Sequence, residues 1–104
     1  LAKLDPLGNL LWQVVLPSPP SWIFGQGYAI GCANDTLIYI LARNAIGSSL
    51  LRYNTQGVFL GATDLDVYVE YRAFAVDATG NAVLGGSHAN TSNVTKVLPS
   101  GAVQ

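Results

Sequence analysis

Apolar residues along the chain fall into short runs that are separated by turn-forming residues. No stretch repeats apolar positions every three or four residues, which is the pattern of an amphipathic helix. Eight runs have the length and the β-branched or aromatic content of strands. They cover residues 10–16, 28–32, 36–42, 49–53, 58–62, 67–76, 81–85 and 94–98. The pattern therefore predicts an all-β protein of antiparallel strands.

Two of these runs predict different degrees of burial. Residues 37–41 are apolar on both faces, which is typical of a strand covered on both sides. Residues 67–76 place Glu70 and Arg72 on one face, which is typical of a half-buried strand whose other face meets solvent.

A four-residue turn recurs between the runs. Residues 5–8, 54–57 and 77–80 each begin with Asp or Asn and end with Gly, and residues 98–101 are a looser copy. An Asp or Asn side chain caps such a turn, and the closing glycine takes the left-handed conformation. A shorter turn is predicted at residues 34–35. These turns predict hairpins.

The hairpins repeat over a longer period. A basic residue precedes the turn glycine by five positions at Lys3, Arg52 and Lys96, which are 49 and 44 positions apart. A period of about 45 residues with four short strands is typical of a β-propeller blade. The predicted division is a half repeat at 1–16, a repeat at 28–66 and a repeat at 67–104. A proline-rich stretch at 17–21 connects the first two units.

Residues 75–86, with Asp77, Gly80 and Asn81 before a short apolar strand, are followed by Lys96 and a turn glycine. This stretch resembles the bacterial beta-propeller repeat family, and residues 1–13 resemble the second half of such a unit. The resemblance implies four-stranded, blade-like antiparallel repeats. It implies an architecture and no particular reaction.

About two units are fewer than the four or more blades of a closed propeller. Three interpretations remain open: a fragment of a larger propeller, a subunit that completes a ring or filament by self-association, or a self-contained β-sandwich. The chain has no methionine, so Leu1 is expected to be a processed terminus or the start of a fragment. Residues 101–104 would form a short last strand, and a short edge favours pairing with a neighbouring chain.

Composition narrows the choice of function. The chain has 104 residues, the length of one domain; half of them are apolar, 11% are charged, and the net charge is −1. This composition argues against disorder, against a nucleic-acid partner and against a polybasic membrane patch. No apolar run reaches the length of a membrane span.

Three Asn-x-Ser/Thr motifs are the sharpest local signal. They predict N-glycosylation at Asn34, Asn90 and Asn93 and an extracellular or cell-surface location. The alternative is coincidence, because turns are rich in Asn, Ser and Thr. These N-linked glycans are the only attached groups expected; no cofactor is predicted.

The sequence offers no constellation for catalysis or for metal binding. His88 is the only histidine, and Cys32, the only cysteine, is expected to be a buried small apolar residue. Asp64 and Asp66 lack the spacing of a calcium loop. Trp12 and Tyr39 are expected to pack between blades. Alternatively, these two could join Trp22, Phe24 and Tyr28 as sugar-stacking platforms.

These observations favour a non-catalytic structural subunit of an extracellular assembly, a ring or filament whose partners are copies of the same chain. The alternative is a carbohydrate- or protein-binding β-propeller module seen as a fragment. An enzyme is not expected.

Overall fold

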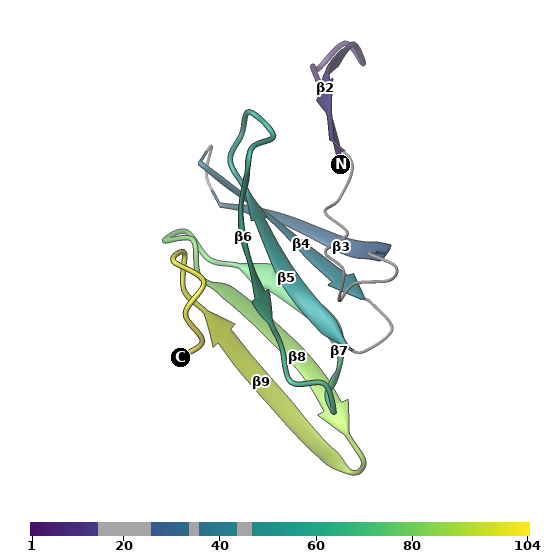
Figure 1. Cartoon of the computed structure of the whole chain (residues 1–104), viewed down its shortest axis with the longest axis vertical. Coiled ribbons are helices and arrows are strands. Elements are labelled where there is room, and N and C mark those ends of the chain that lie inside the picture. Colours follow the sequence, from purple (N-terminus) through teal and green to yellow (C-terminus); the bar gives the residue numbers. More distant parts are fainter. Residues whose placement is uncertain (15–25, 34–35, 44–46) are drawn as a thin grey trace.

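The residues that the structure describes form nine β-strands and contain no helix. The computed structural model describes residues 1–14, 26–33, 36–43 and 47–104. The strands are β1 (Ala2–Leu4), β2 (Leu10–Gln13), β3 (Gln26–Ala33), β4 (Leu37–Arg43), β5 (Ser48–Tyr53), β6 (Phe59–Asp64), β7 (Glu70–Val76), β8 (Ala82–His88) and β9 (Thr91–Val97). They form antiparallel sheets of two, four and three strands, in chain order (Figure 1). The all-β prediction is confirmed.

Most predicted strands agree with the observed ones to within a few residues. Strand β1 was not among the predicted runs, because it is only three residues long. Residues 67–69 are a turn rather than the start of β7, because the Asp66 carboxylate accepts a hydrogen bond from the Tyr68 N–H at 2.9 Å. The predicted connector 17–21 and the predicted turn 34–35 lie outside the described residues.

The four predicted glycine turns are present. Their closing glycines all have a left-handed φ, between 83° and 93°. In each turn the glycine N–H donates to the carbonyl of the first turn residue, as from Gly57 to Asn54 at 3.1 Å. The Asn54 side chain also accepts from two backbone N–H groups at 2.9 Å. The turn chemistry that the sequence predicts is therefore the chemistry that closes the hairpins.

The two central strands of the middle sheet, β4 and β5, are covered on both faces, as predicted for residues 37–41. Alternate residues of β4 belong to two separate apolar clusters. Ile38 and Ile40 face the β1–β2 hairpin, where Leu1 and Trp12 pack against them. Tyr39 and Leu41 face the β7–β9 sheet. This alternation follows from the two-residue period of a strand.

The molecule measures 45 × 32 × 23 Å. The three sheets follow one another along its long axis (Figure 1). The first strand of the middle sheet contacts the first strand of the third sheet. A side chain at Gly31 of β3 would come within 2.9 Å of Phe74 and 2.8 Å of Val76 on β7, so glycine permits this close approach. The sheets do not close into a ring.

Candidate functional site: the contact between successive sheets

The β1–β2 and β5–β6 hairpins, which enclose the turns 5–8 and 54–57, are built in the same register. Lys3 pairs with Trp12 and Leu4 with Leu10 in the first sheet. Arg52 pairs with Gly61 and Tyr53 with Phe59 in the middle sheet. In both, the register shifts directly after the basic residue.

The third sheet begins the same arrangement. Val97 follows Lys96 as Tyr53 follows Arg52, and it forms a bridge with Val103 across the turn. The three hairpins are thus structural copies of one another.

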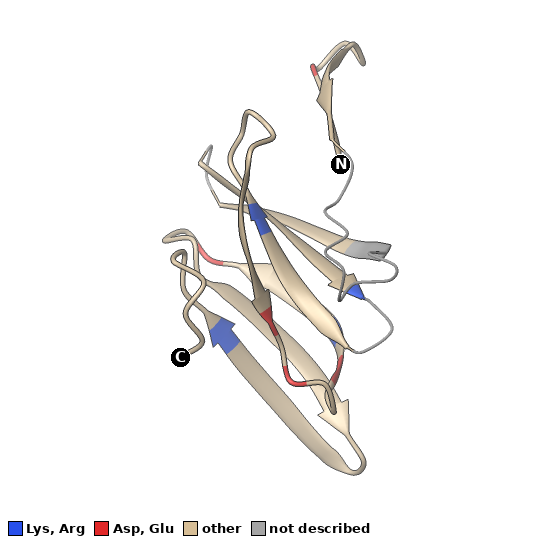
Figure 2. Cartoon of the chain, in the orientation of Figure 1, with Lys and Arg blue, Asp and Glu red and all other residues tan. Residues whose placement is uncertain are grey.

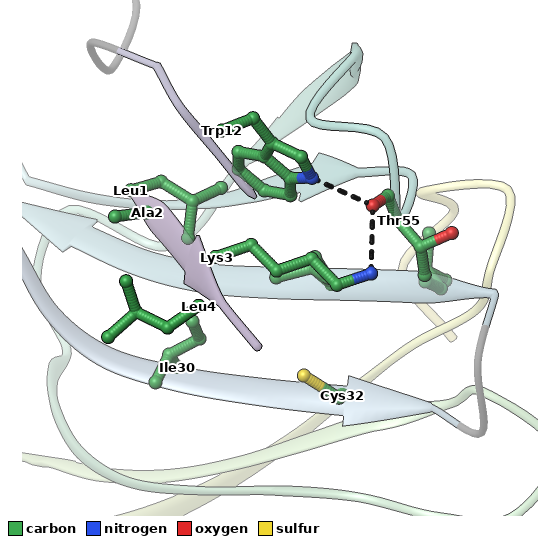
Figure 3. Close-up of a pocket in the computed structure, with 10 residues that line it drawn as sticks. Leu1, Ala2, Lys3, Leu4, Trp12, Ile30, Cys32 and Thr55 are labelled. Carbon is green, nitrogen blue, oxygen red and sulfur yellow. Dashed lines mark hydrogen bonds between the residues drawn. The ribbon is translucent and has the colours of Figure 1, made fainter. Parts of the chain in front are cut away.

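Side chains of the β1–β2 hairpin donate hydrogen bonds to the turn 54–57 of the β5–β6 hairpin. The Lys3 ammonium donates to the Thr55 carbonyl oxygen at 3.3 Å, and the Trp12 indole Nε1 donates to the same oxygen at 3.1 Å (Figure 3). Thr55 is the second residue of the turn 54–57. The acceptor is a backbone atom, so the contact depends on the shape of the turn and not on the side chain of Thr55.

Side chains of the β5–β6 hairpin donate hydrogen bonds to the turn 98–101, which follows β9, in the same way. Arg52 Nη1 donates to the Pro99 carbonyl oxygen at 3.1 Å, and Thr63 Oγ1 donates to the Gly101 carbonyl oxygen at 2.7 Å. Pro99 is the second residue of the turn 98–101, the position that Thr55 holds in its own turn. The same contact therefore occurs twice, between equivalent atoms, along one chain.

The space around each turn glycine shows which turns lie against a side chain of another hairpin. A Cβ at Gly57 would lie 2.9 Å from the Trp12 ring, and a Cβ at Gly101 would lie 2.6 Å from Arg52 Nη2. A Cβ at Gly8, the equivalent glycine of the first turn, would meet nothing within 4 Å. The first turn is thus the one whose outer side is open.

Two buried tyrosines of the middle sheet differ in their partners. The Tyr39 hydroxyl donates to the Gly80 carbonyl oxygen in the third sheet. The Tyr53 hydroxyl is buried and has no partner within the described part of the chain. Burial raises the pKa of both phenols above the usual value.

A cavity of about 330 Å³ lies between β1 and β3. Lys3, Leu4, Trp12, Ile30 and Cys32 are among the side chains that line it (Figure 3). The expectation that Cys32 is buried is wrong: its thiol is exposed. Cys32 lies on the face of β3 that points towards β1, and β1 and β2 alone are too few strands to cover that face.

The other residues considered for chemistry make local contacts. Asp64 accepts a hydrogen bond from Ser49 at 2.7 Å, and Asp66 caps the turn at Tyr68. His88 is exposed at the end of β8, with its ring centroid 5.8 Å from that of Tyr68. Among the described residues, no three His, Cys, Asp or Glu side chains lie close enough to hold a metal ion.

Glu70 and Arg72, predicted to share a face, form an exposed ion pair at 2.8 Å. Charged residues are few, and they are spread over strands and turns (Figure 2). A search of the described residues found no helix that is long and apolar enough to cross a membrane.

The predicted glycosylation sites lie in different surroundings. Asn90 is exposed in the turn between β8 and β9. Asn93 is half-buried on β9, where its amide donates to the Thr91 carbonyl at 3.5 Å. Asn34 lies outside the described residues.

Comparison of the chain with protein-family models, with curated proteins and with solved structures finds no match in any of the three. The contacts between sheets are therefore the main guide to function. Sequence reasoning noted the spacing of Lys3, Arg52 and Lys96 but assigned these residues no role. Their regular spacing was the sequence feature that could have identified this contact. Lys3 and Arg52 are each followed by another hairpin in the chain, and both donate to the backbone of its turn.

Proposed function

We propose that this chain is a non-catalytic structural module of an extracellular assembly. It extends by stacking blade-like antiparallel sheets of the β-propeller type face to face. Each sheet holds the hairpin turn of the next one, and the partners in the assembly are copies of the same chain.

One observation carries this proposal: the contact from a basic side chain to the second carbonyl of the following turn occurs twice. Lys3 makes it to Thr55, and Arg52 makes it to Pro99. An interface that recurs between successive units of one chain is the mark of a repeat architecture, in which each unit contacts its neighbours only. The contact of β3 with β7 supports the propeller type, because first strands then lie together along one side.

Both ends of the stack present apolar surface. Leu50 and Tyr53 of the middle sheet are 0% and 2% exposed because a sheet covers each face. Val94, the equivalent of Leu50 in the third sheet, is 79% exposed, and Leu4, the equivalent of Tyr53 in the first hairpin, is 57% exposed. Apolar positions that are buried inside the stack and open at its ends favour further association.

The extracellular location rests on the glycosylation motifs. Asn90, in a hairpin turn, is accessible to a transferase, whereas Asn93 points partly into the molecule. Among the two described acceptors, Asn90 is therefore the proposed principal site. A glycan there extends from the far end of β8 and β9 and leaves the turn 98–101 uncovered.

The test is the native mass of the 104-residue chain, measured by mass photometry and by sedimentation velocity over a hundredfold range of concentration. A mass that rises in multiples of the chain supports the proposal. A mass that stays at 11.0 kDa plus glycan at every concentration contradicts it. Binding to a glycan array by such a monomer would instead favour the carbohydrate-binding module.

A further inference from the structure

We infer that the outer face of the β7–β9 sheet is a docking surface for the β1–β2 hairpin of a second copy of this chain. Its central contact is a hydrogen bond from the Lys96 ammonium of one copy to the Pro6 carbonyl oxygen of the other. This inference rests on the proposed self-association and names the surfaces that carry it.

Position along the repeat defines the donor and the acceptor. Lys96 lies 44 residues after Arg52, and Pro99 lies 44 residues after Thr55. Pro6 lies 49 residues before Thr55, as Lys3 lies 49 residues before Arg52. Lys96 therefore holds the donor position of the third hairpin, and Pro6 holds the acceptor position of the first turn.

Neither the Lys96 ammonium nor the Pro6 carbonyl has a hydrogen-bond partner among the described residues. Within residues 1–14, 26–33, 36–43 and 47–104, the Lys96 ammonium makes no hydrogen bond or ion pair, and no donor reaches the Pro6 carbonyl. Gly8, in the same turn as Pro6, faces open space, whereas Gly57 and Gly101 face the side chains that hold their turns. The Pro6 carbonyl oxygen, beside the open space at Gly8, is therefore an acceptor that a basic residue of another copy can reach.

Apolar packing follows the same correspondence. Leu1 packs with Tyr53 in one cluster, and Leu50 packs with Val97 in the other. The next pair in this series is Val94 of one copy with Leu4 of the other. Val94 is 79% exposed, and Leu4, which also borders the cavity beside Ile30, is 57% exposed.

Val83 and Leu10 enlarge the two patches. Val83, on the same outer face as Val94, is 37% exposed. Leu10 pairs directly with Leu4 and is 56% exposed. Each surface thus offers an apolar centre beside one polar contact, which is the usual composition of an interface core.

The interface is head-to-tail, because two different surfaces meet. Such a contact leaves one open donor face and one open acceptor face on every dimer. It therefore continues to a ring if the rotation between copies closes and to a filament if it does not. The contact repeats what already occurs twice inside the chain, so docking requires no rearrangement of either sheet.

Cross-linking tests the pairing directly. Both partners carry Cys32→Ser; one also carries Val94→Cys and the other Leu4→Cys. Mixed under mild oxidation, they should give a disulfide-linked heterodimer, and each alone should give several-fold less homodimer. Equal yields from the single and mixed samples would overturn the head-to-tail arrangement.

Point variants measure the contribution of the surface to association. Val94→Asp and Lys96→Ala should each raise the concentration for half-association about tenfold or more. Val58→Asp is the matched control, because Val58 is 55% exposed but lies directly after the turn 54–57, away from both surfaces of the inferred contact. Circular dichroism melts check that all variants remain folded. Since Val94 and Lys96 are on the outer face, their melts should stay close to that of the parent chain.

The outcomes separate this inference from the proposed function. Association of the parent chain that is weakened by Val94→Asp and unaffected by Val58→Asp supports both. Association that neither Val94→Asp nor Lys96→Ala weakens overturns the docking surface and leaves self-association standing. A parent chain that is monomeric at every concentration overturns both.

Discussion

Two buried tyrosines of the middle sheet allow the same substitution to be made with opposite expected effects. Tyr39 and Tyr53 are 0% and 2% exposed. Tyr39 donates its hydroxyl hydrogen to the Gly80 carbonyl of the next sheet, whereas the Tyr53 hydroxyl has no partner among the described residues. Replacement by Phe removes one oxygen from each site and keeps the ring. The two variants thus differ only in whether a hydrogen bond is lost.

The expected change in the free energy of unfolding depends on which hydrogen-bonding group remains buried after each substitution. Tyr39→Phe leaves the buried Gly80 carbonyl without this donor, which costs about 1–3 kcal/mol of the free energy of unfolding. Tyr53→Phe relieves the burial of an unpaired hydroxyl and should stabilise the fold by about 1 kcal/mol. For a chain of this size, 1 kcal/mol corresponds to a shift of about 4–8 °C in Tm.

The assay is urea unfolding followed by tryptophan fluorescence, together with thermal melts at pH 7 and at a concentration low enough to limit association. Tyr39→Phe should lower the urea midpoint and Tyr53→Phe should raise it, with the m-value unchanged. Equal shifts of the same sign would refute the assignment of Tyr39 as a bond between the sheets. An unchanged Tyr39→Phe midpoint would do so as well.

Three further predictions test other parts of the structure. Gly31→Ala should destabilise the fold by about 1–3 kcal/mol, because the added Cβ meets Val76 at 2.8 Å, while Gly85→Ala, whose nearest atom is 3.6 Å away, should change the urea midpoint little. Hydrogen bonds from Asn81 and Thr79 hold the pKa of Asp77 at about 2, below the unfolded value near 4, so its stabilising contribution is present above pH 4 and is lost as the pH falls from about 4 to 2. Melts across this range should therefore fall less steeply for Asp77→Asn than for the parent chain, and equal slopes would contradict this origin of the acid sensitivity. Cys32 is exposed, so the folded monomer should react with one equivalent of a thiol reagent without denaturant, and protection until unfolding would show that the face of β3 is covered.

The hairpins could be predicted from the sequence because their determinants are local. An Asp or Asn at the start and a glycine at the end specify a turn within five residues, and strands of alternating or apolar composition follow. The same locality explains the error at residues 67–69. Val67, Tyr68 and Val69 have high strand propensity, but the Asp66 carboxylate forms a turn with the backbone of Tyr68 instead.

Burial and contacts between sheets could not be predicted in the same way, because they depend on which sheet lies opposite. Cys32 has the sequence context of a core residue and yet is exposed, since only a two-stranded hairpin lies beside that face of β3. Tyr39 and Trp12 were expected to pack between blades; in the structure each donates a hydrogen bond to the backbone of a neighbouring sheet. Their exact acceptors, the Gly80 and Thr55 carbonyls, belong to turns 41 and 43 residues away.

The contact between sheets makes few demands on sequence, and this explains its form in the repeat. Each acceptor is a backbone carbonyl whose position is set by the turn, so Thr55 and Pro99 serve equally well. Each donor needs only a long cationic side chain, so Lys3 and Arg52 both suffice. Two features must be kept together: the basic residue and, five positions later, the glycine that leaves room for the side chain of the preceding sheet. Lys96 keeps the donor position in the third sheet and Gly8 keeps the open glycine position in the first turn, so the inferred contact with another copy would follow the same rule.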